Sequence, residues 1–222
     1  MSTLVVGAAP ACTRDAVIFY RELLAAAGHV VAADGAGEWC IEHGRSPDLV
    51  IGDFDSAAPG ARERLESAGV PVLAFDTDKD ETDLELGVAV ALQRYGSPIT
   101  LTAAFTGRLD HTLAALGALT RAGAGARALE PEWGVHLVCP GAPILMRLSS
   151  GVPFALQSPA GADGVTITGG RWPLRLATLE PLSGRGVSNE ALGGPLTVSV
   201  EAGAVLLIVR ATPTPAGLYS SD

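Results

Sequence analysis

Lysine and cysteine are scarce in this chain of 222 residues. Fourteen of the fifteen basic residues are arginine, and Lys79 is the only lysine. The three cysteines, Cys12, Cys40 and Cys139, lack the spacing of metal ligands, and the four histidines are scattered, so no zinc site is expected. An odd number of cysteines and the lack of a basic-then-apolar export segment indicate reduced thiols and a cytoplasmic location.

Long apolar runs and an excess of positive charge are also missing. No run approaches the roughly 20 apolar residues that span a membrane, and the formal net charge is −9. A surface of this sign repels the phosphate backbone of nucleic acids and anionic lipids. We therefore expect neither nucleic acid nor a membrane as a partner.

The first two thirds of the chain alternate strand-like and helix-like segments. Continuous apolar runs predict strands at residues 4–8, 29–33, 49–51, 70–75, 99–105 and 135–139. Helical spacing of apolar residues predicts helices at residues 13–27, 82–95 and 111–121, and a further helical segment, polar and short, is expected at residues 58–68. This alternation is typical of a parallel sheet covered by helices on both faces, so residues 1–140 are predicted to form an α/β domain.

The pattern changes after about residue 140, where helical periodicity disappears. Short β-type runs follow at residues 164–168, 174–179, 196–200 and 205–210, and clusters of glycine and proline separate them. They predict a small antiparallel sandwich or barrel over residues 141–212. Residues 213–222 lack apolar periodicity, and we expect a loose tail there.

Two carboxylates follow the third predicted strand directly, in the segment Gly52-Asp53-Phe54-Asp55-Ser56. In extended backbone, residues two apart point the same way, which would direct Asp53 and Asp55 to one point. Neighbouring carboxylates repel each other unless a cation lies between them, and Mg²⁺ prefers such oxygen ligands. The pair is a candidate metal site, with a structural role as the alternative, and Ser56 is a candidate N-cap of the next helix.

More acids follow the fourth predicted strand. Asp76, Asp78 and Asp80 alternate along a loop, Lys79 lies among them, and Asp83 falls in the first turn of the next helix. A lysine ammonium suits phosphate as a compact point charge. For Asp83 alone, favourable interaction with the helix dipole is the simpler interpretation.

The start of that helix is marked by Thr82 and Glu85, which form a T-x-x-E capping box.

A third polar group, Arg108, Asp110 and His111, follows the fifth predicted strand. Arg108 could bind phosphate oxygens bidentately, Asp110 could complete a metal shell or cap a helix, and His111 could accept a proton or orient Asp110.

These three groups follow strands of one predicted parallel sheet, and ligands bind at the carboxyl ends of such strands. Several carboxylates, one arginine and one lysine at one edge suit phosphoryl transfer, where positioning and charge neutralisation contribute most. The chain has no G-x-x-x-x-G-K-[ST] segment, so it is not a P-loop enzyme. For any single aspartate, a cap or a turn is the ordinary alternative.

Taken in order, these motifs resemble those of the thiamine pyrophosphokinase family. The resemblance covers roughly residues 30–190 and rests on six segments: 34–36 (D-G-A), 52–56 (G-D-F-D-S), 78–83 (D-K-D-E-T-D), 107–111 (G-R-L-D-H), 168–174 (T-G-G-R-W-P-L) and 186–190 (G-V-S-N-E). The chain departs from the family at Thr106, usually glycine, and at Gly170, usually a bulky leucine. We expect altered packing at both positions and not lost activity.

The resemblance implies a Rossmann-like N-terminal parallel-sheet domain, a C-terminal antiparallel β-sandwich and a homodimer with active sites where the subunits meet. It implies transfer of diphosphate from ATP to the hydroxyl of thiamine, with Mg²⁺ bound and AMP released. An acidic pocket would attract the thiamine cation, and an indole would stack on its rings. The candidate site residues are Asp53, Asp55 and Asp83 for metal and catalysis, Arg108 and Asp110 for catalysis, Asp78, Lys79, Asp80, Arg108 and His111 for the nucleotide, and Trp172, Ser188 and Asn189 for thiamine.

Two other functions fit parts of the sequence. Asp53-Phe54-Asp55-Ser56 resembles the D-x-D-x-[TV] start of haloacid-dehalogenase phosphatases, although that motif usually follows the first strand and here two predicted strands precede it. A non-catalytic module that binds thiamine or a nucleotide would use the same residues without turnover.

Overall fold

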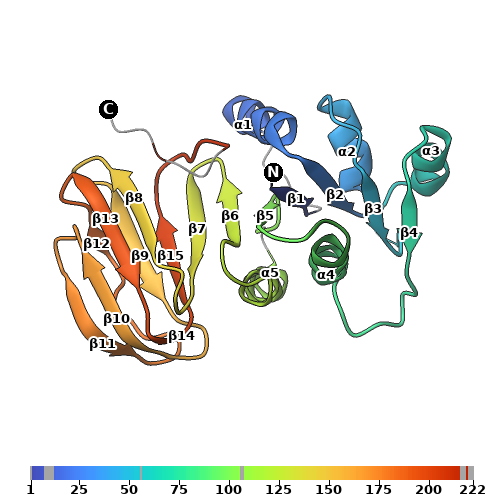
Figure 1. Ribbon diagram of the computed structural model, residues 1–222. Coiled ribbons are helices and arrows are strands. Elements are labelled where there is room, and N and C mark those ends of the chain that lie inside the picture. Colours follow the sequence, from blue (N-terminus) through green and yellow to red (C-terminus); the bar gives the residue numbers. More distant parts are fainter. Residues whose placement is uncertain (1, 8–12, 56, 106–107, 216–218, 220–222) are drawn as a thin grey trace. The chain divides into compact units, whose positions relative to one another are not determined.

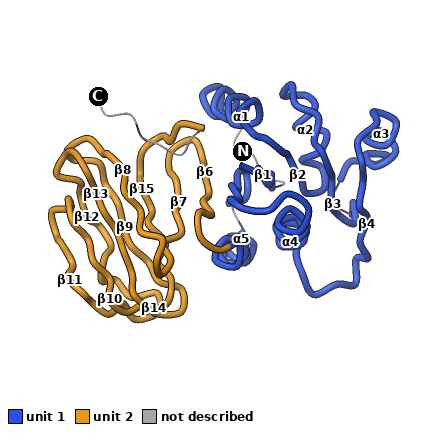
Figure 2. The backbone as a smooth tube through the Cα atoms, in the orientation of Figure 1, with its two compact units in different colours: residues 1–122 blue, residues 123–222 orange. Residues whose placement is uncertain are grey.

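A computed structural model of the chain describes residues 2–7, 13–55, 57–105, 108–215 and 219 (Figure 1). The chain divides into two compact units, Met1–Ala122 and Gly123–Asp222, which Figure 2 colours separately. Among the sequence-predicted features, the end of the first strand at residue 8, Cys12, the N-cap Ser56, Thr106 and Gly107 lie outside the described residues.

Unit 1 alternates strands and helices along the chain. Its elements are β1 (Thr3–Val6), α1 (Arg14–Ala26), β2 (His29–Ala33), α2 (Ala36–Glu42), β3 (Leu49–Gly52), α3 (Ala61–Ser67), β4 (Val72–Ala74), α4 (Asp83–Tyr95), β5 (Ile99–Thr102) and α5 (Leu109–Arg121). The strands pair in parallel in the order β5-β1-β2-β3-β4. The predicted parallel sheet is confirmed for these strands.

Helices cover both faces of this sheet, as Figure 1 shows, with α1, α2 and α3 on one face and α4 and α5 on the other. The strands are therefore largely apolar, and β1 and β3 are buried at every position. Covering both faces leaves the ends of the strands as the places where loops can present polar side chains.

The capping box that begins α4 is present as predicted. Thr82 accepts the backbone N–H of Glu85, and the Glu85 carboxylate accepts the backbone N–H of Thr82 at 3.0 Å. Glu85 also pairs with Arg121 at the end of α5, which joins the two helices on this face. The cap fixes the point at which Asp83 enters the first turn.

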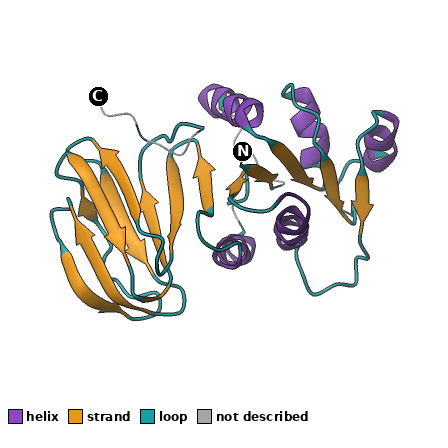
Figure 3. Cartoon of the chain, viewed as in Figure 1, coloured by secondary structure: helices purple, strands orange, loops and turns teal. Residues whose placement is uncertain are grey.

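Unit 2 consists of strands and loops within its described residues, as the colouring of Figure 3 shows. Its strands are β6 (Arg127–Glu130), β7 (Trp133–Val138), β8 (Ile144–Leu148), β9 (Pro153–Gln157), β10 (Ala162–Thr168), β11 (Leu174–Leu179), β12 (Asn189–Glu190), β13 (Gly194–Ser199), β14 (Ala202–Gly203) and β15 (Val205–Val209). They pair antiparallel in two groups, β12-β9-β15-β7-β6 and β11-β10-β13-β8, with β14 beside β10. Residues from both groups share one hydrophobic core, including Phe154 and Leu207 from the first and Val165 and Val198 from the second.

Two features of unit 2 differ from the sequence-based expectations. The run predicted at residues 135–139 belongs to β7, which pairs antiparallel with β6 and β15 and does not extend the parallel sheet. For that reason the compact units divide between Ala122 and Gly123, earlier than the boundary expected after residue 140. In the segment expected to be loose, Tyr219 is buried and its hydroxyl lies 2.9 Å from His136 Nε2.

The helices of the described residues lack the combination of length and apolar character that crossing a membrane requires.

Candidate functional site

Three aspartates meet beyond the carboxyl ends of neighbouring strands in unit 1. Asp34 follows β2, Asp53 follows β3, and Asp83 opens α4. One carboxylate oxygen from each lies within 4.8 Å of the others. We call Asp34, Asp53 and Asp83 the acid cluster. Because β2, β3 and β4 are adjacent and parallel, their loops open on the same edge of the sheet.

Asp34 is the buried member of the acid cluster, with 3% of its surface exposed. Its Oδ1 accepts the backbone N–H of Phe54 at 2.9 Å, which ties the end of β2 to the loop after β3. A Cβ on Gly52 would lie 2.3 Å from the same oxygen. The site therefore requires glycine at position 52 for Asp34 to reach the loop.

Asp55 is exposed and lies outside the acid cluster of the described residues. The reason is Phe54, whose φ of 62° ends the extended backbone on which the predicted alignment of Asp53 and Asp55 depended. The backbone N–H of Asp55 instead donates to Asp53 Oδ1 at 3.2 Å. A role for Asp55 at the metal stays a prediction.

Lys79 supplies a positive charge to the acid cluster. Its ammonium contacts Asp53 Oδ2 and lies 3.1 Å from Asp83 Oδ1. The three side chains are mostly shielded, with exposed fractions of 14% for Lys79, 9% for Asp53 and 22% for Asp83. Lys79 therefore joins the loop after β4 to the loop after β3.

The pKa values in this group follow from burial and from Lys79. The hydrogen bond from Lys79 lowers the pKa of Asp53. Desolvation favours the neutral amine of Lys79, but its hydrogen bond with Asp53 and its ion pairs with Asp53 and Asp83 raise its pKa overall. Burial raises the pKa of Asp83, Lys79 opposes that shift, and the charges of Asp34 and Asp53 add to it.

The acid cluster has the composition that a magnesium ion requires. Asp83 Oδ1 is a buried oxygen with no hydrogen bond among the described residues, although Lys79 lies close to it. A buried acceptor without a hydrogen bond is costly unless a ligand satisfies it. Carboxylate oxygens from several chain segments are the ligand type that Mg²⁺ prefers, so the residues present fit this ion.

The remaining polar residues of unit 1 are more exposed. Asp78 and Asp80 lie on the surface of the loop after β4. Arg108 donates to both carboxylate oxygens of Asp110, at 3.2 and 2.7 Å, and Asp110 Oδ1 accepts the backbone N–H of His111 at 3.0 Å. The hydrogen bond from Arg108 lowers the pKa of Asp110 to about 2.

The group formed by Arg108, Asp110 and His111 follows β5, and β1 and β2 lie between β5 and β3 in the sheet order. The structure thus brings together the first two predicted groups, around Asp53 and Asp83, while Arg108 and Asp110 pair with each other. All three groups follow the carboxyl ends of strands in one parallel sheet.

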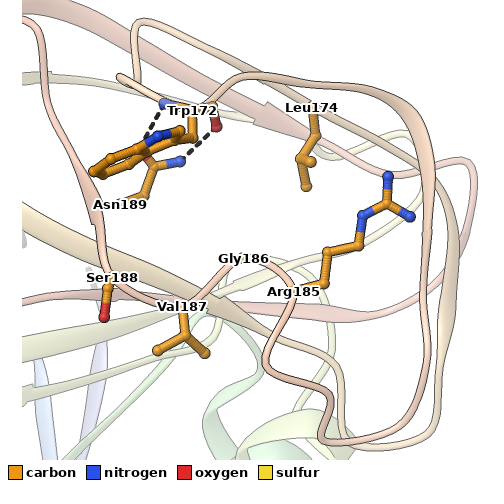
Figure 4. A pocket seen from close by; sticks show the side chains of 7 residues that line it. All are labelled: Trp172, Leu174, Arg185, Gly186, Val187, Ser188 and Asn189. Carbon is orange, nitrogen blue, oxygen red and sulfur yellow. Dashed lines mark hydrogen bonds between the residues drawn. The ribbon is translucent and has the colours of Figure 1, made fainter.

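Unit 2 contains a pocket of about 430 Å³. Figure 4 shows Trp172 and Asn189 on one side, Leu174 and Arg185 on the other, and Gly186 and Val187 between them. Asn189 Oδ1 accepts the backbone N–H of Trp172 at 3.1 Å, and Asn189 Nδ2 donates to the Trp172 carbonyl at 2.7 Å. The buried Asn189 therefore holds the backbone of the exposed Trp172.

The surroundings of Trp172 are less acidic than we expected. Arg185 is the charged residue of this pocket within the described chain, and a neighbouring cavity that shares Trp172, Ser188 and Asn189 adds Glu190 and Arg210. The Arg171 guanidinium lies 4.9 Å from the centre of the Trp172 ring, which is a cation–π contact.

Position 170, where the chain departs from the family, is explained by packing. A Cβ on Gly170 would lie 2.8 Å from the ring of Phe154 and 3.1 Å from Asn189 Oδ1. A bulky residue at this position therefore cannot coexist with Phe154 in its present place. The difference lies directly behind the Trp172 pocket and affects its wall.

Sequence reasoning missed Asp34 as a site residue. The signal was present, because Asp34 follows a predicted strand in the same way as Asp53. Arg185 was also missed, and neither its type nor its spacing marks it in the sequence.

Comparisons with known proteins agree on one family. The family model "Thiamin pyrophosphokinase, catalytic domain" matches residues 20–128. A thiamine pyrophosphokinase of Bacillus subtilis (strain 168) is 27% identical over 180 residues, covering 78% of this chain and 82% of the relative.

Solved structures show the same fold. The crystal structure of thiamine pyrophosphokinase from Bacillus subtilis has a TM-score of 0.77 at 22% identity and covers 96% of this chain and 99% of that one. The yeast thiamin pyrophosphokinase structure has a TM-score of 0.74 at 15% identity, covering 98% and 87%. The mixed α/β fold with its two groups of strands therefore matches these structures.

Proposed function

Because the chain belongs to the thiamine pyrophosphokinase family, we propose that it transfers a diphosphate from ATP to the hydroxyl of thiamine. The products are thiamine diphosphate and AMP. The observation in the structure that best supports this reaction is the acid cluster, which joins three carboxylates to Lys79 at the carboxyl edge of a parallel sheet. That is where nucleotide phosphates bind in open α/β sheets.

The acid cluster is the proposed magnesium site, with Asp34, Asp53 and Asp83 as the residues that would hold the ion. Mg²⁺ bound there would offset the negative charge of the ATP phosphates. Asp55, Asp78 and Asp80, which are exposed on the loops after β3 and β4, would add negative charge around it. Asp83 Oδ1 supports this assignment, because it is buried, contacts Lys79 through an ion pair and accepts no hydrogen bond among the described residues.

The cationic side chains act on the phosphates themselves. Arg108 is 67% exposed and presents a planar fork to Asp110, and the same fork matches two oxygens of a phosphate. His111, next to Asp110, would lie beside the bound nucleotide. Lys79 adds a compact ammonium from the loop after β4.

The reaction replaces one phosphorus–oxygen bond with another. The hydroxyl oxygen of thiamine bonds to the β-phosphorus, the bond from that phosphorus to the oxygen bridging the α-phosphorus breaks, and AMP leaves with that oxygen. The hydroxyl proton is released to solvent, so thiamine and ATP give thiamine diphosphate, AMP and one proton. The protein's contribution is to align the two substrates and to stabilise the charge on the transferred group.

Thiamine is assigned to the pocket beside Trp172. One face of the indole already contacts Arg171. Trp172 has 54% of its surface exposed and lines the pocket. Flat cationic rings stack well on such an indole. Ser188 and Asn189 line the same pocket, where the Ser188 hydroxyl would hydrogen-bond to the ligand and Asn189 would hold the Trp172 backbone in place.

The names of the two folds, the division between domains, the location and the oligomeric state belong to the same proposal. The parallel order β5-β1-β2-β3-β4 supports the name Rossmann-like for unit 1, and the core shared by two antiparallel groups supports a β-sandwich for unit 2. A functional division near residue 140, a cytoplasmic location and a homodimer complete it. Sedimentation equilibrium tests the homodimer directly.

Product analysis tests the proposed reaction against its alternatives. With thiamine, ATP and Mg²⁺, we expect AMP and thiamine diphosphate in equal amounts. A phosphatase would instead release inorganic phosphate from phosphomonoesters, and a binding module would give no product. The family match opposes both alternatives.

Two aspartate variants compare the loop carboxylates. Asp53→Asn is expected to lower kcat by about two orders of magnitude or more, because it removes a charge from the acid cluster. If Asp55 also reaches the metal, Asp55→Asn lowers kcat as strongly. Steady-state rates across Mg²⁺ concentrations measure both, and circular dichroism checks the fold. Wild-type rates for Asp53→Asn would refute the metal site.

A further inference from the structure

The single lysine of the chain occupies a position that a metal ion would also favour. Lys79 contacts Asp53 Oδ2 and lies 3.1 Å from Asp83 Oδ1, so its ammonium bridges two of the three aspartates. Its side chain is 14% exposed. A lysine aimed only at a phosphate would not need to be shielded among carboxylates.

The charges of the acid cluster explain why a cation must be there. Three carboxylates whose oxygens lie within 4.8 Å of one another repel strongly. One ammonium offsets only part of this charge. Asp83 Oδ1 remains without a hydrogen bond within the described chain even with Lys79 beside it. The cluster is thus held together by Lys79 but left short of positive charge.

The position of Lys79 in the chain allows it to leave. It lies in the loop between β4 and α4, ahead of the Thr82 cap, so no helix fixes its backbone. Its ammonium sits at the end of a flexible four-carbon stem, unlike the rigid guanidinium of arginine. The side chain can therefore turn outward while Asp83 stays fixed by the capping box.

We propose that Lys79 is an internal counter-cation of the acid cluster, which a divalent cation displaces and which then pairs with the phosphates of the nucleotide. This inference rests on the proposed function, because it takes the acid cluster as the metal site. Lys79 thus plays two roles in turn. It first stabilises the empty carboxylates, and afterwards it neutralises phosphate oxygens.

Competition between Lys79 and the divalent cation has a thermodynamic consequence. A divalent cation binding alone must displace an ammonium that has no new partner. When nucleotide is present, its phosphates pair with the ammonium, and the free-energy cost of displacing Lys79 from the carboxylates falls. Binding of metal and nucleotide is therefore cooperative, and the coupling is reciprocal.

Metal binding to the nucleotide-free protein tests this competition. Mn²⁺ serves as the probe, and electron paramagnetic resonance measures its free concentration. We expect Lys79→Gln to bind Mn²⁺ at least about fivefold more tightly than wild type, the lower end of typical coupling between two sites. The same variant should show weaker cooperativity between Mn²⁺ and an unreactive ATP analogue, and a lower kcat.

A matched control separates this effect from a change in net charge. Arg62→Gln removes one positive charge from an exposed pair with Glu66 on α3 and should leave Mn²⁺ affinity unchanged. Equal or weaker Mn²⁺ binding by Lys79→Gln would overturn the proposal. Tighter binding by both variants would overturn it too, since general charge would then explain the result.

A second measurement needs no variant, because lysine occurs once. Protein made with lysine carrying ¹³C at Cε gives one labelled side chain, Lys79. Mg²⁺ alone should shift its resonance, and the ATP analogue should shift it further. A signal unchanged under saturating Mg²⁺ would overturn the proposal while leaving the function intact. Failure to bind Mg²⁺ and to form product would instead refute the proposed function.

Discussion

Among single residues, Asp34 has the clearest structural task. Its carboxylate accepts the Phe54 N–H at 2.9 Å and so holds the loop that carries Asp53. Asp34→Ala removes this acceptor and should destabilise the protein by about 1–3 kcal/mol, the usual cost of an unsatisfied buried group. It should also abolish activity, because Asp53 loses its position. Urea denaturation and steady-state kinetics measure the two effects.

The amide variant at the same position separates structure from charge. Asp34→Asn keeps an oxygen for Phe54, so its stability should stay within about 1 kcal/mol of wild type. Its affinity for Mg²⁺ should nevertheless fall, because one carboxylate of the proposed site is gone. If Asp34→Asn and Asp34→Ala behave alike in both measurements, the hydrogen bond to Phe54 does not position the loop.

Trp172 supports a prediction about substrate. Its exposed indole lines the pocket assigned to thiamine. Trp172→Ala should raise KM for thiamine about tenfold or more, since loss of a cation–π and stacking contact costs roughly 1–2 kcal/mol. KM for ATP should stay the same. Trp172→Phe, which keeps a ring, should recover part of the loss, and equal KM values for thiamine in all three proteins would exclude stacking there.

The candidate site was predicted residue by residue with uneven success. Asp53, Lys79 and Asp83 follow consecutive strands, and parallel topology brings them together as predicted. The alignment of Asp55 with Asp53 was not found, because a positive φ at Phe54 cannot be read from the residue type. Arg185 was missed as a pocket residue because pocket walls depend on packing between distant strands.

At the scale of elements, the junction of β3 with its loop requires glycine at position 52. A Cβ on Gly52 would lie 2.3 Å from Asp34 Oδ1. Gly52→Ala should therefore destabilise the protein by about 1–3 kcal/mol, as overpacking does, and reduce activity by displacing Asp34. Thermal denaturation and product formation measure both.

Gly35 offers a nearby control. Nothing lies within 4 Å of a Cβ placed there, and its φ of −59° suits any residue. Gly35→Ala should leave stability unchanged or raise it slightly. A loss as large as that of Gly52→Ala would show that the whole segment is intolerant, and that the contact with Asp34 is not the cause.

Strand β7 carries a buried histidine that makes unit 2 sensitive to acid. His136 lies beside Tyr219 and opposite Arg127 on β6. Burial, and then the charge of Arg127, lower the pKa of His136 from 6.5 to about 4. Between these values the unfolded chain binds a proton that the folded chain does not, so stability falls as pH drops from 6.5 towards 4.

The predicted size of this effect follows from the shift in pKa. Wild type should lose about 2–3 kcal/mol between pH 7 and pH 4.5 through His136. Glutamine does not titrate, so the free energy of unfolding of His136→Gln should fall by about 2–3 kcal/mol less than that of wild type over the same pH range. Urea denaturation at both pH values measures the difference. Parallel losses in the two proteins would mean that His136 is protonated in the folded state.

Which elements could be predicted depended on their local signals. Helix α4 was found with its capping box, since Thr82, Glu85 and an apolar face are all visible in the sequence. Helix α2 was missed because it has only seven residues and contains Gly37, which packs closely on Val50. Strand β9 was missed because it begins at Pro153, a residue that argues against a strand.

At the scale of the whole molecule, the order of elements predicted the fold class. Strand–helix alternation gave the parallel sheet of unit 1. The assignment of β6 and β7 to unit 2 depends on pairing with β15, near the other end of the chain. Pairing between segments so far apart leaves no local signal in the sequence.

The proposed reaction requires the acid cluster to be the place where metal and ATP phosphates bind. A crystal structure of the protein with Mn²⁺, an unreactive ATP analogue and thiamine tests it most directly, because Mn²⁺ is located by its anomalous scattering. We predict an anomalous peak at about 2.2 Å from oxygens of Asp53 and Asp83, with nucleotide phosphates on its open side and Lys79 turned towards them. A fully bound nucleotide whose metal lies away from both aspartates would contradict the account.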